Sequence, residues 1–170
     1  FHVIIAVRNV KAGEDFSKKM MNECFKVTDR TSEVMELDVS SLKSVKKFAD
    51  DVKKRFPKID LLVNNAGILF HDFELTEDGF EMQLATNYLG HFYLTHLLMD
   101  NLKRASDEGN RRARVVNVSS CIHYFGEIWF DDINMEKCHD PVGGYSRTKL
   151  AQVFKTILFY IFSFDHLKRC

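Results

Sequence analysis

Alternating segments of two kinds run through the first third of the chain, and they constrain its fold more than any other feature. His2 to Val7 is a run of strand length rich in β-branched residues, residues 33–37 are a short alternating segment, and residues 59–63 are another strand of the buried type. Between these runs, residues 11–25 and 42–56 carry apolar side chains at helical spacing amid charged ones. The order strand, helix, strand, helix, strand predicts an α/β fold with a parallel sheet and helices on both faces.

The second half of the chain continues the same alternation. Residues 76–104 predict one long helix, residues 114–118 predict another strand, and a last helix is expected after Gly143-Gly144. Residues 121–141 contain several aromatic side chains and are interpreted as a surface loop, with a role in walling a substrate pocket as the alternative. With 170 residues, the chain is expected to form a single domain.

Composition argues against several classes of partner and site. Acids and bases balance at a formal net charge of zero, which gives no reason to expect nucleic acid or an anionic membrane as a partner. The four cysteines show no C-x-x-C spacing and the seven histidines no metal-motif spacing, so we predict neither a disulfide framework nor a metal site. Such cysteines favour a reducing compartment on the cytoplasmic side, and the apolar run at residues 157–162 is too short for a membrane span.

Tyr145 and Lys149 lie four residues apart in the last predicted helix, so their side chains share one face of it. A phenol is a poor base at neutral pH, but a fixed neighbouring cation favours its ionised form. Ser120 follows the strand at residues 114–118, at the edge where ligands bind in open parallel sheets, and it could hold a substrate oxygen. These residues predict a proton-transfer site, although the pair alone leaves open a chance Y-x-x-x-K on a helix surface.

Four motifs follow one another in the order and at the separations of a known family. Asn64-Asn65-Ala66-Gly67 comes after a strand, Asn87 lies in the next helix, and Ser120 and the pair Tyr145 and Lys149 complete the series. In these residues the chain resembles the short-chain dehydrogenase/reductases. The resemblance implies a Rossmann-like, doubly wound parallel sheet, which this chain would hold in incomplete form.

The likeness extends over residues 1–156, and the phrases at residues 76–81 and 87–92 resemble the retinol dehydrogenase-like subgroup. It implies that residues 1–170 form a single, partial NADP-binding domain. The implied function is hydride transfer between NADP(H) and a small-molecule alcohol or carbonyl substrate. A retinoid or another lipophilic aldehyde or ketone is the implied substrate class.

The resemblance also assigns catalytic roles. Tyr145 would be the general acid and base for the alcohol proton, and Lys149 would favour the ionised phenol and hydrogen-bond the nicotinamide ribose. Ser120 would orient the carbonyl oxygen. Asn87 would hold a water that links Lys149 to bulk solvent, whereas an amide packed against its own helix backbone is the plain structural alternative.

The residue after the second strand of this fold distinguishes the two nicotinamide cofactors. An acid there binds the ribose 2′-hydroxyl of NAD, whereas a basic residue suits the 2′-phosphate of NADP. The run His2 to Val7 corresponds to the second strand of the fold, because the fold's first strand would precede it. Arg8 follows this run and no acid does, so NADP is predicted, with an exposed loop charge as the alternative. By resemblance, further cofactor contacts come from strand ends and from the catalytic helix: Asp38, Val39, Asn65, Ala66, Gly67, Tyr145 and Lys149. Asp38 and Val39 would contact the adenine.

Both ends of the chain are expected to be incomplete, because no glycine-rich phosphate turn precedes His2 and no further strand follows residue 156. In the strand order 3-2-1-4-5-6, the absent first strand is the central one, so the isolated chain is predicted to bind NADPH weakly or not at all. A truncated, inactive product that acts only through protein interaction is the alternative function. A nucleotide-sugar epimerase is a third reading, against which Asn64 to Gly67 argue. A homodimer through helices of the parent enzyme and an anchor before residue 1 stay open.

Overall fold

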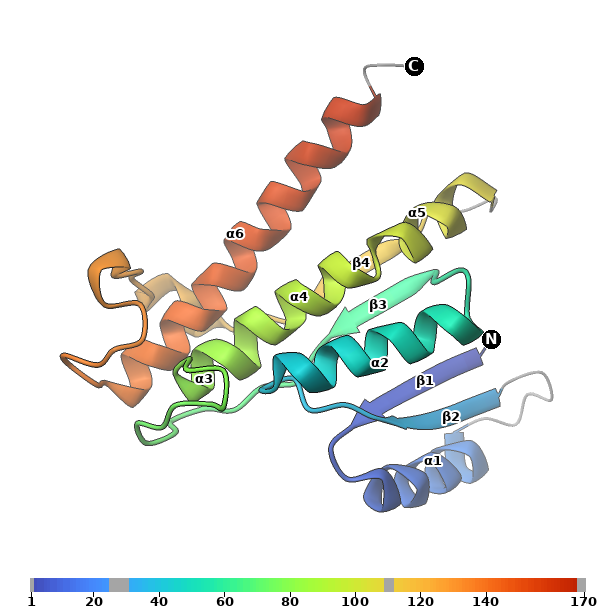
Figure 1. The fold of residues 1–170 in the computed structure, drawn as a ribbon, viewed down its shortest axis with the longest axis horizontal. Coiled ribbons are helices and arrows are strands. Elements are labelled where there is room, and N and C mark those ends of the chain that lie inside the picture. Colours follow the sequence, from blue (N-terminus) through green and yellow to red (C-terminus); the bar gives the residue numbers. More distant parts are fainter. Residues whose placement is uncertain (1, 25–30, 109–111, 168–170) are drawn as a thin grey trace. The chain divides into compact units, whose positions relative to one another are not determined.

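The computed structural model describes residues 2–24, 31–108 and 112–167 (Figure 1). The chain divides into two compact units, one from Phe1 to Asp38 and one from Val39 to Cys170. The prediction that residues 1–170 form a single domain concerns how the two units join, and it stays a prediction.

In the first unit, two parallel strands are joined by a helix. Strand β1 (His2–Val7) pairs along its length with β2 (Thr31–Glu36), and α1 (Val10–Cys24) connects them. The side chain of Asn9 begins the helix by accepting a hydrogen bond from a backbone N–H of the first turn at 3.0 Å. These elements confirm the predicted strand, helix and parallel pairing, although β2 begins earlier than expected. Phe25, the last residue of the predicted helix, lies outside the described residues.

Helix α1 packs on its strands through small residues. Gly13 is buried, and a Cβ added to it would lie 2.7 Å from Val7 Cγ2, so glycine allows this close approach. Ser17, one turn further on, is also buried, and its hydroxyl oxygen lies 2.6 Å from that of Ser32. Of the apolar residues whose spacing predicted the helix, Ala12 and Phe16 are exposed, with Phe16 at 55%.

The second unit contains its own parallel strand pair. Strands β3 (Leu61–Asn64) and β4 (Arg114–Asn117) run in register, with Asn64 opposite Asn117. The four described strands form two separate two-stranded sheets, β1 with β2 and β3 with β4. These are the pairs of neighbours expected in the order 3-2-1-4-5-6 when the strands of this chain are taken as the second to the fifth.

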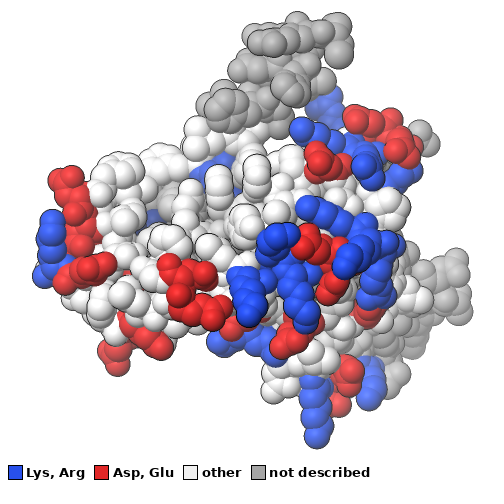
Figure 2. All heavy atoms as spheres, in the orientation of Figure 1, with Lys and Arg blue, Asp and Glu red and all other residues white. Residues whose placement is uncertain are grey.

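Helix α2 (Leu42–Arg55) contributes one face to the core of the second unit and carries charge on the other. The side chain of Ser41 caps its N-terminus, and four apolar residues of one stripe are buried: Val45, Phe48, Ala49 and Val52. On the exposed face, Lys46 pairs with Asp50 at 2.7 Å. Figure 2 shows basic and acidic side chains interleaved on the face in view, so charges of both signs lie close together there.

The long helix predicted over residues 76–104 begins later than expected and is interrupted. Thr76 to Gly79 form a turn in which Gly79 has φ +79°, and the carboxylate of Glu81 accepts hydrogen bonds from the next two free N–H groups, at 2.8 Å each. The first helical N–H groups need such an acceptor, so the helix begins after Glu81. The helical stretch consists of α3 (Met82–Leu84), the π-helical turn η1 (Ala85–Leu89), α4 (Gly90–Leu97) and α5 (Met99–Glu108).

Gly90 allows α4 to lie directly against the residues that lead into α2. A Cβ added to Gly90 would clash with the carbonyl oxygen of Val39, which is itself a buried residue. Helices α2 and α4 contact each other beyond this point, and Leu94 and Leu98 are buried there in the core. This close approach therefore fixes the position of η1 and α4 within the second unit.

The segment between β4 and the last helix is the irregular loop that the sequence predicted. It contains two short 3-10 turns, η2 (Cys121–Phe125) and η3 (Phe130–Asp132). Large side chains remain exposed in it, with Tyr124 at 81%, Phe125 at 84% and Phe130 at 83%. The loop is nevertheless packed on the last helix at Gly126, where an added Cβ would lie 2.6 Å from a helix carbonyl oxygen.

The last helix, α6 (Pro141–Leu167), begins at Pro141, so the prediction that it follows Gly143-Gly144 is wrong. The side chain of Asp140 accepts a hydrogen bond from the N–H of Val142 at 3.0 Å. Proline suits the first helical position because its missing N–H would have no partner there, and the Asp-Pro pair outweighs the two glycines. Within the part of the chain that the structure describes, neither α6 nor any other helix has the length and hydropathy to cross a membrane.

Candidate active site

The carboxyl ends of β3 and β4 meet at one polar edge. Asn64 is almost completely buried, and its side-chain amide donates to Asn117 Oδ1 at 2.8 Å and to Thr95 Oγ1 at 3.1 Å. The exposed run Asn65 to Gly67 leaves β3 at this edge, and Ser119 and Ser120 follow β4. The parallel pairing therefore brings the two predicted strand-end motifs to the same side of the sheet.

Asn87 is fully buried in the π-helical turn and joins three segments. Its Oδ1 accepts a hydrogen bond from the N–H of Ile68 at 2.8 Å, and its Nδ2 donates to the carbonyl oxygen of Ile68 at 2.9 Å and to Thr148 Oγ1 at 3.0 Å. The side chain thus connects the segment after β3 to α6. The catalytic role predicted for Asn87 stays a prediction, while its contacts show it bracing the residues around the site.

Lys149 follows Thr148, which Asn87 contacts, and is itself only 5% exposed. Its Nζ donates a hydrogen bond to the carbonyl oxygen of Val118 at 3.1 Å, and Ser119 Oγ donates to the carbonyl oxygen of Lys149 at 2.8 Å. Burial lowers the pKa of the Lys149 ammonium. A Cβ added to Gly67 would lie 3.1 Å from Asn87 Oδ1 and 3.7 Å from Lys149 Nζ, so the glycine keeps the space between strand end and ammonium open.

Tyr145 is half-buried one turn before Lys149, with Lys149 Nζ 5.5 Å from the centroid of its ring. Tyr145 and Lys149 are therefore neighbours in space, as their four-residue spacing predicts. Ser120 caps η2, since its Oγ accepts a hydrogen bond from the N–H of Ile122 at 3.4 Å. This bond uses a lone pair of Oγ and leaves the hydroxyl hydrogen for an acceptor such as a carbonyl oxygen.

Sequence reasoning did not single out Gln152 or His91, which surround the main chain of Asn87. Gln152 Nε2 donates to the carbonyl oxygen of Asn87 at 2.5 Å and to His91 Nδ1 at 3.0 Å. Burial, with a further contribution from the charge of Lys155, lowers the pKa of His91 to about 4, so its ring is neutral at pH 7. The spacings of Asn87 to His91 and of Lys149 to Gln152 place each pair on one helix face, and this was the available signal.

The remaining predicted cofactor residues are divided between the two units. Arg8 is exposed in the turn after β1, where it lines an open hollow of about 410 Å³ together with apolar side chains that include Ile5 and Val7. Asp38 ends the first unit half-buried, and Val39 begins the second unit buried against Gly90. In the described part of the chain, no three His, Cys, Asp or Glu side chains are grouped so as to hold a metal ion.

Besides the site formed by Gly67, Asn87, Tyr145 and Lys149, the chain matches a known protein family over most of its length. The family model described as short chain dehydrogenase matches residues 1–130, and the chain belongs to this family. Members of the family use nicotinamide cofactors, and the space that Gly67 leaves open beside Lys149 Nζ fits such a ligand.

Within the family, the sequence is retinol dehydrogenase-like. The chain is similar to retinol dehydrogenase 13 of Mus musculus, with 40% identity over 156 residues, which cover 91% of this chain and 44% of the relative. It is also similar to short-chain dehydrogenase TIC 32 B, chloroplastic, of Brassica napus, with 41% identity over 155 residues, 89% of this chain and 48% of the relative. The chain thus spans about half the length of the curated relatives it matches.

A solved structure agrees with the fold. An alcohol dehydrogenase from the archaeon Thermococcus sibiricus, complexed with 5-hydroxy-NADP, superposes with a TM-score of 0.66 at 26% identity, covering 93% of this chain and 59% of that chain. The prediction of a Rossmann-like parallel α/β fold is confirmed by this likeness together with the family match.

Proposed function

We propose that this chain carries the catalytic side of an oxidoreductase that transfers a hydride between NADP(H) and an alcohol or carbonyl substrate. The observation that carries the proposal is the grouping of Gly67, Asn87, Tyr145 and Lys149 at the carboxyl edge of the strands. This group places a phenol next to a fixed ammonium and beside the exposed backbone of a glycine. The family assignment favours this function over that of an inert interaction product.

The proton of the reaction is assigned to Tyr145. In reduction, its hydroxyl gives a proton to the carbonyl oxygen of the substrate, and in oxidation the phenolate takes the proton of the alcohol. The buried ammonium of Lys149, held by the carbonyl of Val118, lies 5.5 Å from the centroid of the Tyr145 ring and places a positive charge beside the phenol. The hydroxyl of Ser120 orients the substrate oxygen, and a bound nicotinamide would supply or accept the hydride.

The choice of NADP is supported by Arg8 at the end of β1. A guanidinium presents several N–H donors to a phosphate, whereas NAD enzymes place a carboxylate there for the ribose hydroxyl. The complex of the similar Thermococcus sibiricus enzyme with 5-hydroxy-NADP points the same way. The other proposed cofactor contacts remain those of the strand ends and of the catalytic helix: Asp38, Val39, Asn65, Ala66, Gly67, Tyr145 and Lys149.

A lipophilic aldehyde or ketone is the proposed substrate class, with a retinoid as one example. Two of the residues that follow Gly67 are apolar and exposed: Leu69 is 57% exposed, and Phe70, whose ring packs against that of Tyr145, is 52% exposed. An apolar surface next to the proton donor suits a hydrocarbon chain attached to the reacting carbon. The name of retinol dehydrogenase 13, one of the similar proteins, agrees with this class.

The experiment is turnover of NADPH with a panel of aldehydes of increasing chain length. The chain is compared with a version preceded by a strand and a glycine-rich phosphate turn, because that turn supplies the binding site for the pyrophosphate. In the version that turns over, Tyr145→Phe should abolish activity while Tyr124→Phe, at an exposed tyrosine, leaves it unchanged. Activity retained by Tyr145→Phe would exclude the phenol as proton donor.

A further inference from the structure

Phe70 has a backbone conformation that a bulky residue rarely adopts. Its φ angle is 55°, in the left-handed region, and it carries a phenyl side chain. A large residue in this region is strained, and such strain persists only where the surroundings hold the residue in place. The neighbours of Phe70 should therefore be held by other parts of the structure, and the segment before it is.

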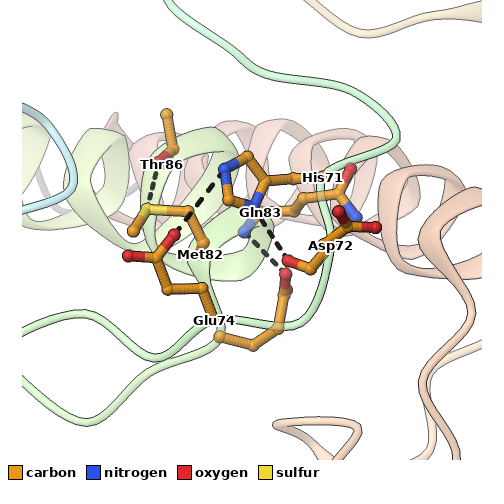
Figure 3. A network of polar contacts seen from close by, with 7 residues as sticks. His71, Asp72, Glu74, Met82, Gln83 and Thr86 are labelled. Carbon is orange, nitrogen blue, oxygen red and sulfur yellow. Dashed lines mark hydrogen bonds and ion pairs between the residues drawn. The ribbon is translucent and has the colours of Figure 1, made fainter.

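Ile68, two residues before Phe70, has both backbone groups bonded to the buried side chain of Asn87, at 2.8 and 2.9 Å. After Phe70, His71 Nδ1–H donates to the carbonyl oxygen of Asp72 at 2.8 Å, and its Nε2 lies 3.8 Å from Glu74 Oε2. Figure 3 shows the His71 ring placed between Asp72 and Glu74 beside the helix that begins at Met82. The segment before the strained residue is thus bound to a buried side chain, and the contacts after it lie within the same loop.

The ring that is held in this way lies against the proposed proton donor. The centroids of the Phe70 and Tyr145 rings are 6.0 Å apart, and their planes meet edge to face at 69°. Lys149 Nζ is 5.5 Å from the centroid of the same tyrosine ring. Tyr145 therefore has a charged neighbour and an apolar neighbour, and Phe70 is half exposed, so its outer side is open to a substrate.

We propose that Phe70 is a specificity-determining residue, which narrows the approach to the Tyr145 hydroxyl and favours carbonyl groups on unbranched chains over those with bulk next to the carbonyl. The inference rests on the proposed function, because it takes Tyr145 as the group that the substrate oxygen must reach. The phenyl ring of Phe70, packed against the phenol ring with 6.0 Å between the centroids, occupies space that a branched or aryl substituent would need. An extended chain can lie along the exposed side of the same ring.

Access to the Tyr145 hydroxyl can be measured without turnover. The chain is treated with N-acetylimidazole or with N-benzoylimidazole, and acylation of each tyrosine is followed by mass spectrometry of its peptide. The benzoyl-to-acetyl rate ratio at Tyr145 should be several-fold below that of the exposed Tyr124. Phe70→Ala should raise the ratio at Tyr145 to that of Tyr124, and Phe130→Ala, which removes an exposed phenyl group from the segment between β4 and α6, should not change it.

A second variant guards against a folding defect. Phe70→Gly removes the ring and adopts the left-handed conformation without strain, so it should raise the ratio as the alanine does. Equal ratios at Tyr145 in the original chain, Phe70→Ala and Phe70→Gly would overturn the inference and leave the proposed function standing. Activity retained by Tyr145→Phe would instead overturn the function, and the acylation ratios would still show whether Phe70 controls access.

Discussion

Replacing Lys155 by methionine should stabilise the second unit at neutral pH. Lys155 lies in α6 and is only 1% exposed, and its Nζ has no hydrogen-bond partner among the described residues. The ammonium lies 5.9 Å from the centroid of the Phe159 ring, which is a weak substitute for water. Burial lowers the pKa of Lys155 from 10.5 to about 7.

The size and sign of the effect follow from this pKa. The unfolded chain binds the proton of Lys155 more tightly than the folded chain does, so the buried charge destabilises the fold fully below pH 7. The cost then falls as the pH rises from about 7 to 10.5. At about 1.4 kcal/mol for each tenfold change in proton affinity, the upper bound is roughly 5 kcal/mol. Mutations that bury an unpartnered polar group typically cost about 1–3 kcal/mol, and this smaller figure is the expected gain.

Methionine keeps the length and flexibility of the side chain and removes the charge. Urea unfolding of both proteins, followed by far-ultraviolet circular dichroism at pH 7, 8.5 and 10, should show a gain for Lys155→Met that shrinks as the pH rises. Lys103→Met removes a charge from an exposed position in α5 and should change little. A gain that is absent at pH 7, or equal at all three pH values, would refute the reasoning.

Further predictions concern packing, acid stability and cofactor binding. Gly90→Ala should lower the free energy of unfolding by about 1–3 kcal/mol in urea titrations, against the higher helix propensity of alanine, because the new methyl group meets the Val39 carbonyl; a stabilised variant would contradict this. Folding lowers the pKa of His91 from 6.5 to about 4, so between these pH values the unfolded chain binds more protons and the free energy of unfolding should drop as the pH falls from 6.5 to 4. His91→Gln should show a shallower drop, and an equal drop would refute the assignment. Fluorescence titration of this 170-residue chain with NADPH should show weak or undetectable binding, because its sequence contains no G-x-x-x-G-x-G motif to bind the pyrophosphate. Saturation at low micromolar cofactor would contradict this.

Hydrophobic periodicity predicted elements correctly where their formation depends on the residues of the element itself. His2 to Val7 is a strand as predicted, and α2 buries the stripe that its spacing indicated. Turn and cap chemistry was misjudged where two signals competed. Glu81 begins a helix that was expected at Thr76, and Asp140 begins one that was expected after two glycines. In both cases a side-chain acceptor for free N–H groups decided the boundary.

The sequence by itself determined the order of strands and helices, their parallel connection, the family, and the identity of the Tyr145 and Lys149 pair, because these depend on short spacings and on residue type. Only the tertiary structure decided what surrounds that pair. Asn87 reaches Ile68 across 19 positions and Thr148 across 61, and no local pattern specifies such partners. The packing of Phe70 against Tyr145 and the burial of Lys155 likewise depend on how loops and helices pack, since packing joins residues that the chain keeps apart.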